Sequence, residues 1–352
     1  MTDAAKPFLR GLPGGTATGV GSWPGADADE AARIVLGELA ALPHLVELPA
    51  RGVGADMVGR TAALLVDLAV EVAPSGYRVA SRPGRDHRRA VDLLRRDLDV
   101  LEEALERAGA TPPALKVQVA GPWTMAAQVE LRSGHRLLTD RGAVAEVTAS
   151  LAEGVAQHVA EVQRRTGIPV VLQVDEPGLP GVLAGALPTV SGLTTIPAVP
   201  APEVEAGLRT VLEQAPGRTM VHCCAAAVPL TLIRRAGATA VGVDLGLVGV
   251  TDLDEIGETL EDGAMLVLGV VPVPVSVPAS GGASATTLHQ LAEPALRLMD
   301  RLGFPRSVLS TEVLVTPGCG LAGSTPADAR RLLAQCVELG RAFTDPPESW
   351  GM

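Results

Sequence analysis

The chain has 352 residues, and its 29 Lys and Arg against 40 Asp and Glu give a formal net charge of −11. Hydrophobic residues make up 47% and charged residues 20%, which excludes intrinsic disorder because the chain can bury a large core. Aromatic residues are only 2%, and with the acidic balance this argues against a nucleic-acid-binding surface. The length suits one large barrel or two ordinary domains.

Two uncharged stretches, 177–202 and 263–288, exceed the roughly 20 residues that a membrane span needs. Each contains several prolines, so neither can be a continuous lipid-exposed helix. The N-terminal residues lack the apolar segment of a signal peptide, and four cysteines do not make a disulfide scaffold. We therefore expect a cytoplasmic protein with no membrane partner.

Short apolar runs alternate with longer segments of helical periodicity along the chain. The predicted strands are 16–22, 44–48, 115–121, 169–176, 218–224, 238–246, 264–271 and 307–315. The predicted helices are 88–108, 144–165, 203–214, 253–260, 288–302 and 327–342, and 55–72 also has a helical pattern. Thr325 and Pro326 are a typical cap and first turn for the last helix.

This alternation predicts an α/β fold with parallel strands and crossover helices. About eight strand–helix pairs favour a (β/α)₈ TIM barrel over an open doubly wound sheet. We expect a single domain over 1–352, with 1–14 and 345–352 as terminal extensions. Catalytic residues of such barrels lie at the carboxyl ends of the strands, so polar residues there carry extra weight.

The predicted strand 218–224 ends in His222-Cys223-Cys224. Residues i and i+2 of a strand share a face, so the His222 imidazole and the Cys224 thiol point the same way. An imidazole and a thiolate are half of a zinc site, although all three residues could instead be buried in packing. Two further strand ends complete the ligand inventory of a catalytic zinc, because they carry Asp244 and Cys319. We expect Cys223 and Cys336 to pack in the core.

A second polar pair, Asp175 and Glu176, ends the predicted strand 169–176. Asp175 shares a face with Gln173, so we expect one carboxylate to enter the site and the other to pair elsewhere; a solvated turn is the alternative. The Pro- and Gly-rich segment 177–202 that follows could serve as a lid. Gly21 and Ser22 end the first strand and could bind a substrate carboxylate, but GVGSW is not a dinucleotide fingerprint.

Together these motifs resemble one family in their order along the chain. The motifs are ATGVGSWPG (17–25), VAGPWTM (119–125), LQVDEPGLPG (172–181), VHCC (221–224), GVDLG (242–246) and TPGCGL (316–321). They resemble the catalytic C-terminal barrel of cobalamin-independent methionine synthase, over about residues 15–343. The separate N-terminal barrel of that family has no counterpart here, so the likeness is to the short single-barrel type.

The resemblance implies a zinc-dependent methyltransferase that converts homocysteine to methionine. It places the zinc ligands at His222, Cys224 and Cys319, with Asp244 where the family has a glutamate.

For the substrate, the resemblance implies that Gly21 and Ser22 bind homocysteine and that Asp175 binds its amine. A further substrate carboxylate lies between the first and third strands, where Glu47 and Asp56 are both candidates.

Three departures from the family pattern bear on the chemistry. Asp244 is one methylene shorter than glutamate, and Gln128 replaces the tryptophan that packs on the folate. Residues 271–274, Val-Pro-Val-Pro, replace an Asp-x-His-Ser segment. The methyl donor is therefore either methyltetrahydrofolate or a methyl corrinoid, which could be carried on a protein. Alternatives are a zinc alkyltransferase for another thiol, a porphyrinogen-decarboxylase-like enzyme and a non-catalytic binding protein.

Overall fold

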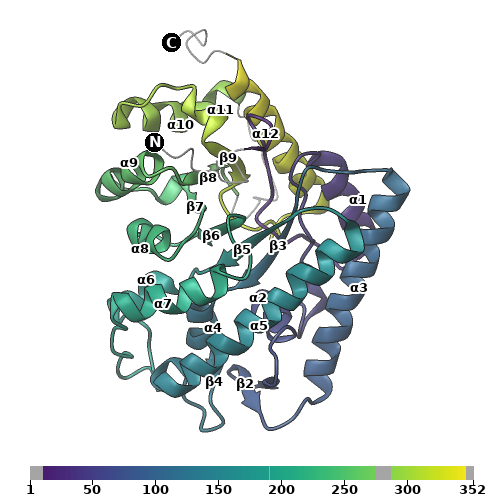
Figure 1. Ribbon diagram of the computed structural model, residues 1–352, viewed down its shortest axis with the longest axis vertical. Coiled ribbons are helices and arrows are strands. Elements are labelled where there is room, and N and C mark those ends of the chain that lie inside the picture. The colour runs from purple at the N-terminus through teal and green to yellow at the C-terminus, as the bar shows by residue number, and fades with distance from the viewer. Residues whose placement is uncertain (1–10, 190, 274–286, 346–352) are drawn as a thin grey trace, which may run out of the picture.

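The computed structural model describes residues 11–189, 191–273 and 287–345. Most of the two expected terminal extensions, and Pro274 of the departing segment, lie outside these residues. Within them, six parallel strands form a curled sheet in the order β3-β5-β6-β7-β8-β9 (Figure 1). The strands are β3 (Leu115–Ala120), β5 (Val170–Asp175), β6 (Thr219–Cys223), β7 (Ala240–Asp244), β8 (Met265–Val271) and β9 (Val313–Pro317). The expected mixed α/β fold is confirmed as a half-barrel that resembles a TIM barrel.

The two strands predicted at 16–22 and 44–48 are wrong as regular strands. Each segment makes only isolated parallel bridges, which pair Ala17 with Val315, Ser22 with Glu47, and His44 with Lys116. Glycines interrupt the first segment, and Gly21 takes a φ of +151°, so no continuous ladder forms there. The bridges nevertheless connect the first segment to β9, the second segment to β3, and the two segments to each other.

Helices surround the parallel sheet on its outer side (Figure 1). Of these, α3, α5, α7, α9, α10 and α12 are close to the predicted bounds. The helices are α1 (Ala28–Glu38), α2 (Met57–Ala62), α3 (Arg85–Ala108), α4 (Pro122–Gln128), α5 (Arg141–Thr166), α6 (Leu179–Ala184), α7 (Ala201–Leu212), α8 (Leu230–Arg235), α9 (Leu253–Glu261), α10 (Leu288–Leu302), α11 (Val308–Thr311) and α12 (Pro326–Thr344). None of the described helices combines the length and the apolar character that crossing a membrane requires.

Capping residues set the bounds of the long helices. The predicted cap of α12 is confirmed, because the Thr325 hydroxyl accepts a hydrogen bond from the Asp328 amide at 3.1 Å. Asp140 caps α5 in the same way, and Gly167 ends that helix in the left-handed conformation, with a φ of +68°.

Two further predictions from the helical and apolar patterns are wrong. The helical pattern over 55–72 yields only the short α2, because Asp67 takes a φ of +58° and the chain then turns into a hairpin. The hairpin strands β1 (Ala69–Ala73) and β2 (Gly76–Ala80) form a small separate sheet with β4 (Val129–Glu130). The run 307–315 splits into α11 and β9, since only its buried end joins the sheet.

The parallel sheet separates two apolar clusters. The large cluster lies between the sheet and the helices and includes Leu172, Val221 and Val241, which are all fully buried. Most members of the small cluster occupy alternate positions of the same strands, so this cluster lies on the opposite, inner face. Its members are Leu12, Leu42, Ala114, Val171, Met220, Ala240, Met265, Val267 and Leu314.

A buried ion triplet anchors the segment between 49 and 62 to α3. The Asp97 carboxylate is 3% exposed and accepts two hydrogen bonds of 2.7 Å from Arg51 and one of 2.5 Å from Arg60. Arg60 belongs to α2, and Arg51 lies in the 3₁₀ turn Pro49–Arg51 that follows Glu47. The triplet therefore holds the chain on either side of Asp56 against the helix layer.

We expect the variant Asp97→Ala to lose about 3–5 kcal/mol in free energy of unfolding, because it leaves two buried guanidinium groups unpaired. Asp99→Ala on the same helix is the matched control. Its carboxylate is 62% exposed and pairs with Arg165 at the surface, so a loss below about 1 kcal/mol is expected. Urea unfolding followed by circular dichroism measures both values. Equal losses in the two variants would contradict the role assigned to the triplet.

Candidate active site at the carboxyl end of the sheet

The inner face of the parallel sheet changes from apolar to polar toward the carboxyl ends of its strands. On β5 the inner positions run Val171, Gln173, Asp175, and on β6 they run Met220, His222. The register pairs Asp175 with His222 on the neighbouring strand. The apolar cluster thus fills the interior toward the amino ends of the strands. Polar side chains lie toward the carboxyl ends, where the catalytic residues of barrel enzymes are found.

Asp175 and His222 are in direct contact. The His222 Nδ1 atom lies 3.0 Å from Asp175 Oδ1, and both side chains are 9% exposed. The same Oδ1 accepts a hydrogen bond of 2.7 Å from Gln173 Nε2, as the shared face of these two residues predicts. Within the described residues, Asp175 Oδ2 has no hydrogen-bond partner, so it is available to a ligand.

The neighbouring carboxylate, Glu176, points away from this interior. It is fully buried and accepts hydrogen bonds from the Trp123 amide (2.9 Å), the Thr124 amide (2.7 Å) and the Thr124 hydroxyl (2.6 Å). These donors are in the first turn of α4, so Glu176 holds that helix against β5. One carboxylate of the pair thus enters the inner face, while the other serves packing.

Cys224 and Cys319 come from strand ends almost one hundred residues apart, and their thiols lie close enough to interact. Their interaction lowers the pKa of Cys319 and raises the pKa of Cys224, because one thiol donates to and stabilises the thiolate of the other. Both cysteines are free and partly exposed. Cys223 and Cys336 are free and buried, in keeping with packing roles.

Asp244 ends β7 beside the turn that carries Cys319. A Cβ on Gly318 would lie 3.0 Å from three atoms of the Asp244 carboxyl group, so a larger residue here would push this carboxyl group aside. Asp244 Oδ1 accepts a hydrogen bond of 2.9 Å from the Gly246 amide, and the side chain is only partly buried. The carboxylate is therefore held at the rim, next to the cysteine loop.

The four predicted metal ligands lie at the same end of the sheet, on β6, β7 and the turn after β9. Among the described residues, no three His, Cys, Asp or Glu side chains are grouped closely enough to hold a metal ion as they stand. Two neighbouring thiols, an imidazole and a rim carboxylate are nevertheless the donor types that zinc prefers. By the chemistry of its donor atoms alone, this set of side chains fits zinc.

The two candidates for the further substrate carboxylate have different surroundings. Glu47 is 7% exposed and accepts a hydrogen bond of 3.3 Å from Gln118 Nε2. Burial, reinforced by the charge of Asp175, raises the pKa of Glu47 to about 7.

Asp56 instead caps α2 through the Gly59 amide at 3.0 Å and accepts a hydrogen bond from the Tyr77 hydroxyl. Glu47 is thus close enough to Asp175 for the charge of Asp175 to act on it, whereas Asp56 is engaged in a structural contact.

Gly21 and Ser22 lie beside the cysteine loop. The Leu321 amide donates to the Ser22 carbonyl at 2.9 Å. A Cβ on Gly320 would lie 2.1 Å from Ser22 Oγ, so this hydroxyl is packed against the loop that carries Cys319. Gly21 has a φ of +151°, which favours glycine, and a Cβ there would lie 2.5 Å from Gln118 Nε2 and push this amide aside.

The structure also brings together buried polar residues that the sequence did not single out. Lys116 is fully buried and donates to the Val20 carbonyl at 2.9 Å and to Gln173 Oε1. Gln118 lies on the same face of β3 and has an unpartnered buried Oε1 atom. The alternation of LKVQVA, with two polar side chains inside a buried strand, is the signal that could have found them.

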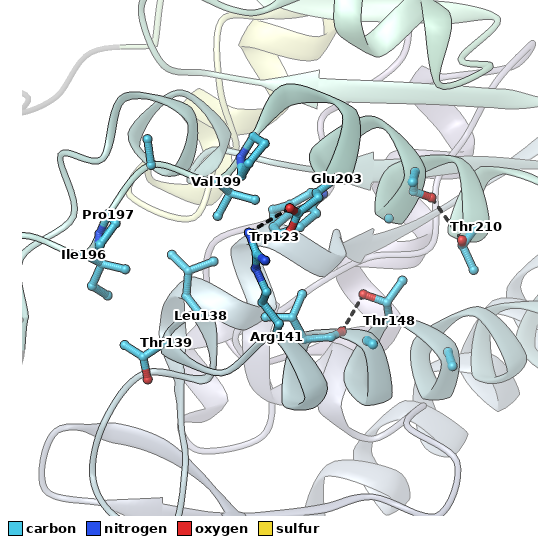
Figure 2. A pocket seen from close by; sticks show the side chains of 17 residues that line it. Trp123, Leu138, Thr139, Arg141, Thr148, Ile196, Pro197, Val199, Glu203 and Thr210 are labelled. Carbon is cyan, nitrogen blue, oxygen red and sulfur yellow. Dashed lines mark hydrogen bonds and ion pairs between the residues drawn. The ribbon is translucent and has the colours of Figure 1, made fainter.

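A pocket lies outside this interior, between α5 and α7 (Figure 2). Its volume is about 640 Å³, and segment 196–200 of the loop proposed as a lid forms one wall. Trp123 lines it, and an ion pair of 2.9 Å between Arg141 and Glu203 crosses it. None of the predicted site residues lines this pocket.

Of the residues that depart from the family pattern, Gln128 is the exposed last residue of α4, and Val271 is the buried end of β8.

Comparison with solved structures gives one match that covers nearly the whole fold. A B12-independent methionine synthase from Shewanella sp. W3-18-1, in complex with selenomethionine, matches with a TM-score of 0.61 at 11% identity. The match covers 96% of this chain and 99% of that one. At this identity the likeness concerns the fold.

Two further structures match less well. A 3-keto-D-glucoside 4-epimerase from E. coli has a TM-score of 0.38 at 13% identity, covering 71% of this chain and 86% of its own. A GH113 β-1,4-mannanase has a TM-score of 0.41 at 10% identity, covering 93% and 99%. No curated protein matches the sequence.

The family described as "Cobalamin-independent synthase, Catalytic domain" matches residues 15–342, which include every predicted site residue. This is nearly the entire chain. The chain therefore belongs to the cobalamin-independent methionine synthase family, whose members are methyltransferases, and carries the family's catalytic domain.

Proposed function

We propose that this enzyme transfers a methyl group onto the thiol of homocysteine to give methionine, within one catalytic domain built on a closed eight-fold barrel. The observation that supports it best is the set of groups at one end of the sheet: the thiol pair of Cys224 and Cys319 with the Asp175–His222 contact beside it. The bridges of segments 16–22 and 44–48 support the closure of the barrel.

The chemical requirement is a thiolate nucleophile. A free thiol has a pKa near 8.5, so only a small part of it is ionised at neutral pH. The family uses zinc, and here His222, Cys224, Cys319 and Asp244 would hold it. When bound, zinc would keep the substrate sulfur deprotonated and nucleophilic at neutral pH. Asp244 is the rim carboxylate and would be the ligand that gives way to the substrate.

The remaining residues bind and orient the amino-acid part of the substrate. Asp175 Oδ2 and the nearby Glu47 carboxyl group would accept hydrogen bonds from the ammonium group. The Gly21 amide and the Ser22 hydroxyl would bind the carboxylate next to the cysteine loop. Asp56 would contribute indirectly, by fixing α2 near Glu47. Holding both ends of the amino acid would aim its sulfur at the methyl group.

Residues that the chain lacks bear on the choice of methyl donor. Gln128 offers no aromatic ring to stack on a pterin, and Val271 with Pro272 offers no acid–base group at the end of β8. We therefore propose methyltetrahydrofolate and a methyl corrinoid, free or on a protein, as the two donors to compare.

We expect about one zinc ion per purified chain, because the ligands are those of a catalytic site. Cys224→Ser and Cys319→Ser should each lose the metal, since both sulfurs are needed. Cys223→Ala is the matched control, because this neighbouring thiol is buried and should leave the metal content unchanged. Elemental analysis measures the content. Zinc retained by both serine variants would remove the assignment.

Zinc-loaded protein should convert homocysteine to methionine with at least one of the two donors. Mass spectrometry of the product, with methyltetrahydrofolate and methylcobalamin supplied separately, tests this. Cys319→Ser protein under the same conditions should form no methionine, because its thiolate site is incomplete. If no methionine forms with methyltetrahydrofolate, the methyl corrinoid remains the expected donor. If no methionine forms with either donor, the proposal is contradicted.

Gly320→Ala should raise the KM for homocysteine about tenfold, because the new Cβ pushes the Ser22 hydroxyl away from the carboxylate. Gly323→Ala in the same loop is the control, since its Cβ would meet no atom within 4 Å. Steady-state kinetics and thermal unfolding are measured on both variants. An unchanged KM in a folded Gly320→Ala protein would argue against Ser22 as a substrate contact.

A further inference from the structure

A continuous chain of hydrogen bonds crosses three strands below the site. It begins at Lys116 on β3, passes through Gln173 and Asp175 on β5, and ends at His222 on β6. All four residues are buried, with exposures of 0%, 2%, 6% and 7%. Since side chains in an interior are held in place by their partners, each member constrains the next.

The contacts of the Gln173 amide fix its orientation. One amide atom lies 2.8 Å from the Val20 carbonyl and 2.7 Å from Asp175 Oδ1, which are both acceptors, so it must be the nitrogen Nε2. The oxygen Oε1 therefore faces Lys116 and accepts a hydrogen bond from its Nζ atom. Burial lowers the pKa of Lys116 to about 7, and an amine can donate this hydrogen bond in either protonation state. A flipped amide would place its oxygen against two acceptors.

Asp175 then determines which nitrogen of His222 carries the proton. An ionised carboxylate only accepts hydrogen bonds, so the contact of 3.0 Å requires a proton on His222 Nδ1. In a neutral imidazole the proton-free lone pair is then on Nε2. Metal-binding histidines are commonly oriented by a carboxylate on the second nitrogen in this way.

We propose that Lys116 and Gln173 are positioning residues, which act through Asp175 to keep His222 in the tautomer with Nδ1 protonated and Nε2 free for a metal ion. This rests on the proposed function, because zinc is the metal that Nε2 would bind. The chain also keeps Asp175 Oδ2 free for the substrate ammonium, since Oδ1 alone satisfies both Gln173 and His222.

The competing explanation is that Lys116 only balances the charges of Asp175 and Glu47, with which it interacts electrostatically. In that case the side chain of Gln173 would need no amide nitrogen. Gln173→Leu separates the two explanations, because it leaves every charge unchanged but removes the donor to Asp175. Charge balance predicts little effect of this change, whereas the positioning role predicts loss of the tautomer preference.

The tautomer can be measured without any metal. Metal-free protein labelled with ¹⁵N-histidine is examined by long-range ¹H–¹⁵N NMR, and a His222→Gln variant identifies the His222 signals. The wild type should show a protonated Nδ1 and an unprotonated Nε2. Lys116→Met and Gln173→Leu should each give signals averaged between the two tautomers. Using two variants keeps the test decisive if one fails to fold.

Gln118→Leu is the matched control. Gln118 lies on the same face of β3 and is also buried, but its amide donates to the Leu45 carbonyl and to Glu47, and among the described residues it makes no hydrogen bond with Asp175. This variant should keep the wild-type tautomer. A wild-type tautomer in both Lys116→Met and Gln173→Leu overturns the inference.

Zinc affinity gives the second readout. Competition with a chromophoric chelator should show binding weakened by about 10–100-fold in Lys116→Met and Gln173→Leu, as expected when a partner of a ligating histidine is lost. Unchanged affinity in both variants also overturns the inference. If the wild-type protein binds no zinc while the tautomer pattern follows the prediction, the proposed metal fails and the positioning role stands.

Discussion

The Asp175 carboxylate is the group on which the polar interior of this sheet depends. A charge buried among apolar strands is costly unless it is paired and hydrogen-bonded. Asp175 meets this condition with one oxygen, Oδ1, which serves both Gln173 and His222, while Lys116 supplies the opposite charge at the far end of the chain. The interaction joins β3, β5 and β6, so the same bonds that allow the charges to be buried also hold the imidazole at the rim.

The inner face of the sheet is divided between an apolar base and a polar upper layer. Large side chains such as Met220 and Met265 fill the base, where close packing excludes water. Toward the carboxyl ends of the strands, glycines take the place of larger side chains. A Cβ on Gly242 would press on His222, and a Cβ on Gly318 would press on the Asp244 carboxyl group. A Cβ on Gly269 would press on the backbone of β7 and of the turn after β9. These positions leave room for functional side chains, so the site is created as much by small residues as by reactive ones.

The residues that follow the family pattern and those that depart from it lie at different places in the fold. The cysteine pair, His222 and Asp175 lie at one end of the sheet, and the family match covers all of them. The departures lie around this group: Asp244 at the rim, Gln128 at the end of α4 and the segment that begins at Val271. The residues proposed to hold the substrate thiol thus lie together at the carboxyl end of the sheet, and the departures lie at its margin.

The sequence by itself determined the α/β class, the parallel strands from 115 onward and the face on which Gln173, Asp175, His222 and Cys224 lie, because period-two alternation is a local property of each strand. It did not determine the short bridges of segments 16–22 and 44–48, the hairpin that replaced the helix predicted over 55–72, or the choice between Glu47 and Asp56 as the neighbour of Asp175. Only the tertiary structure decided that Lys116, Gln173 and His222 form one chain of contacts. The reason is that strand register and the curvature of the sheet bring together residues 57 and 106 positions apart, and no local pattern encodes that distance.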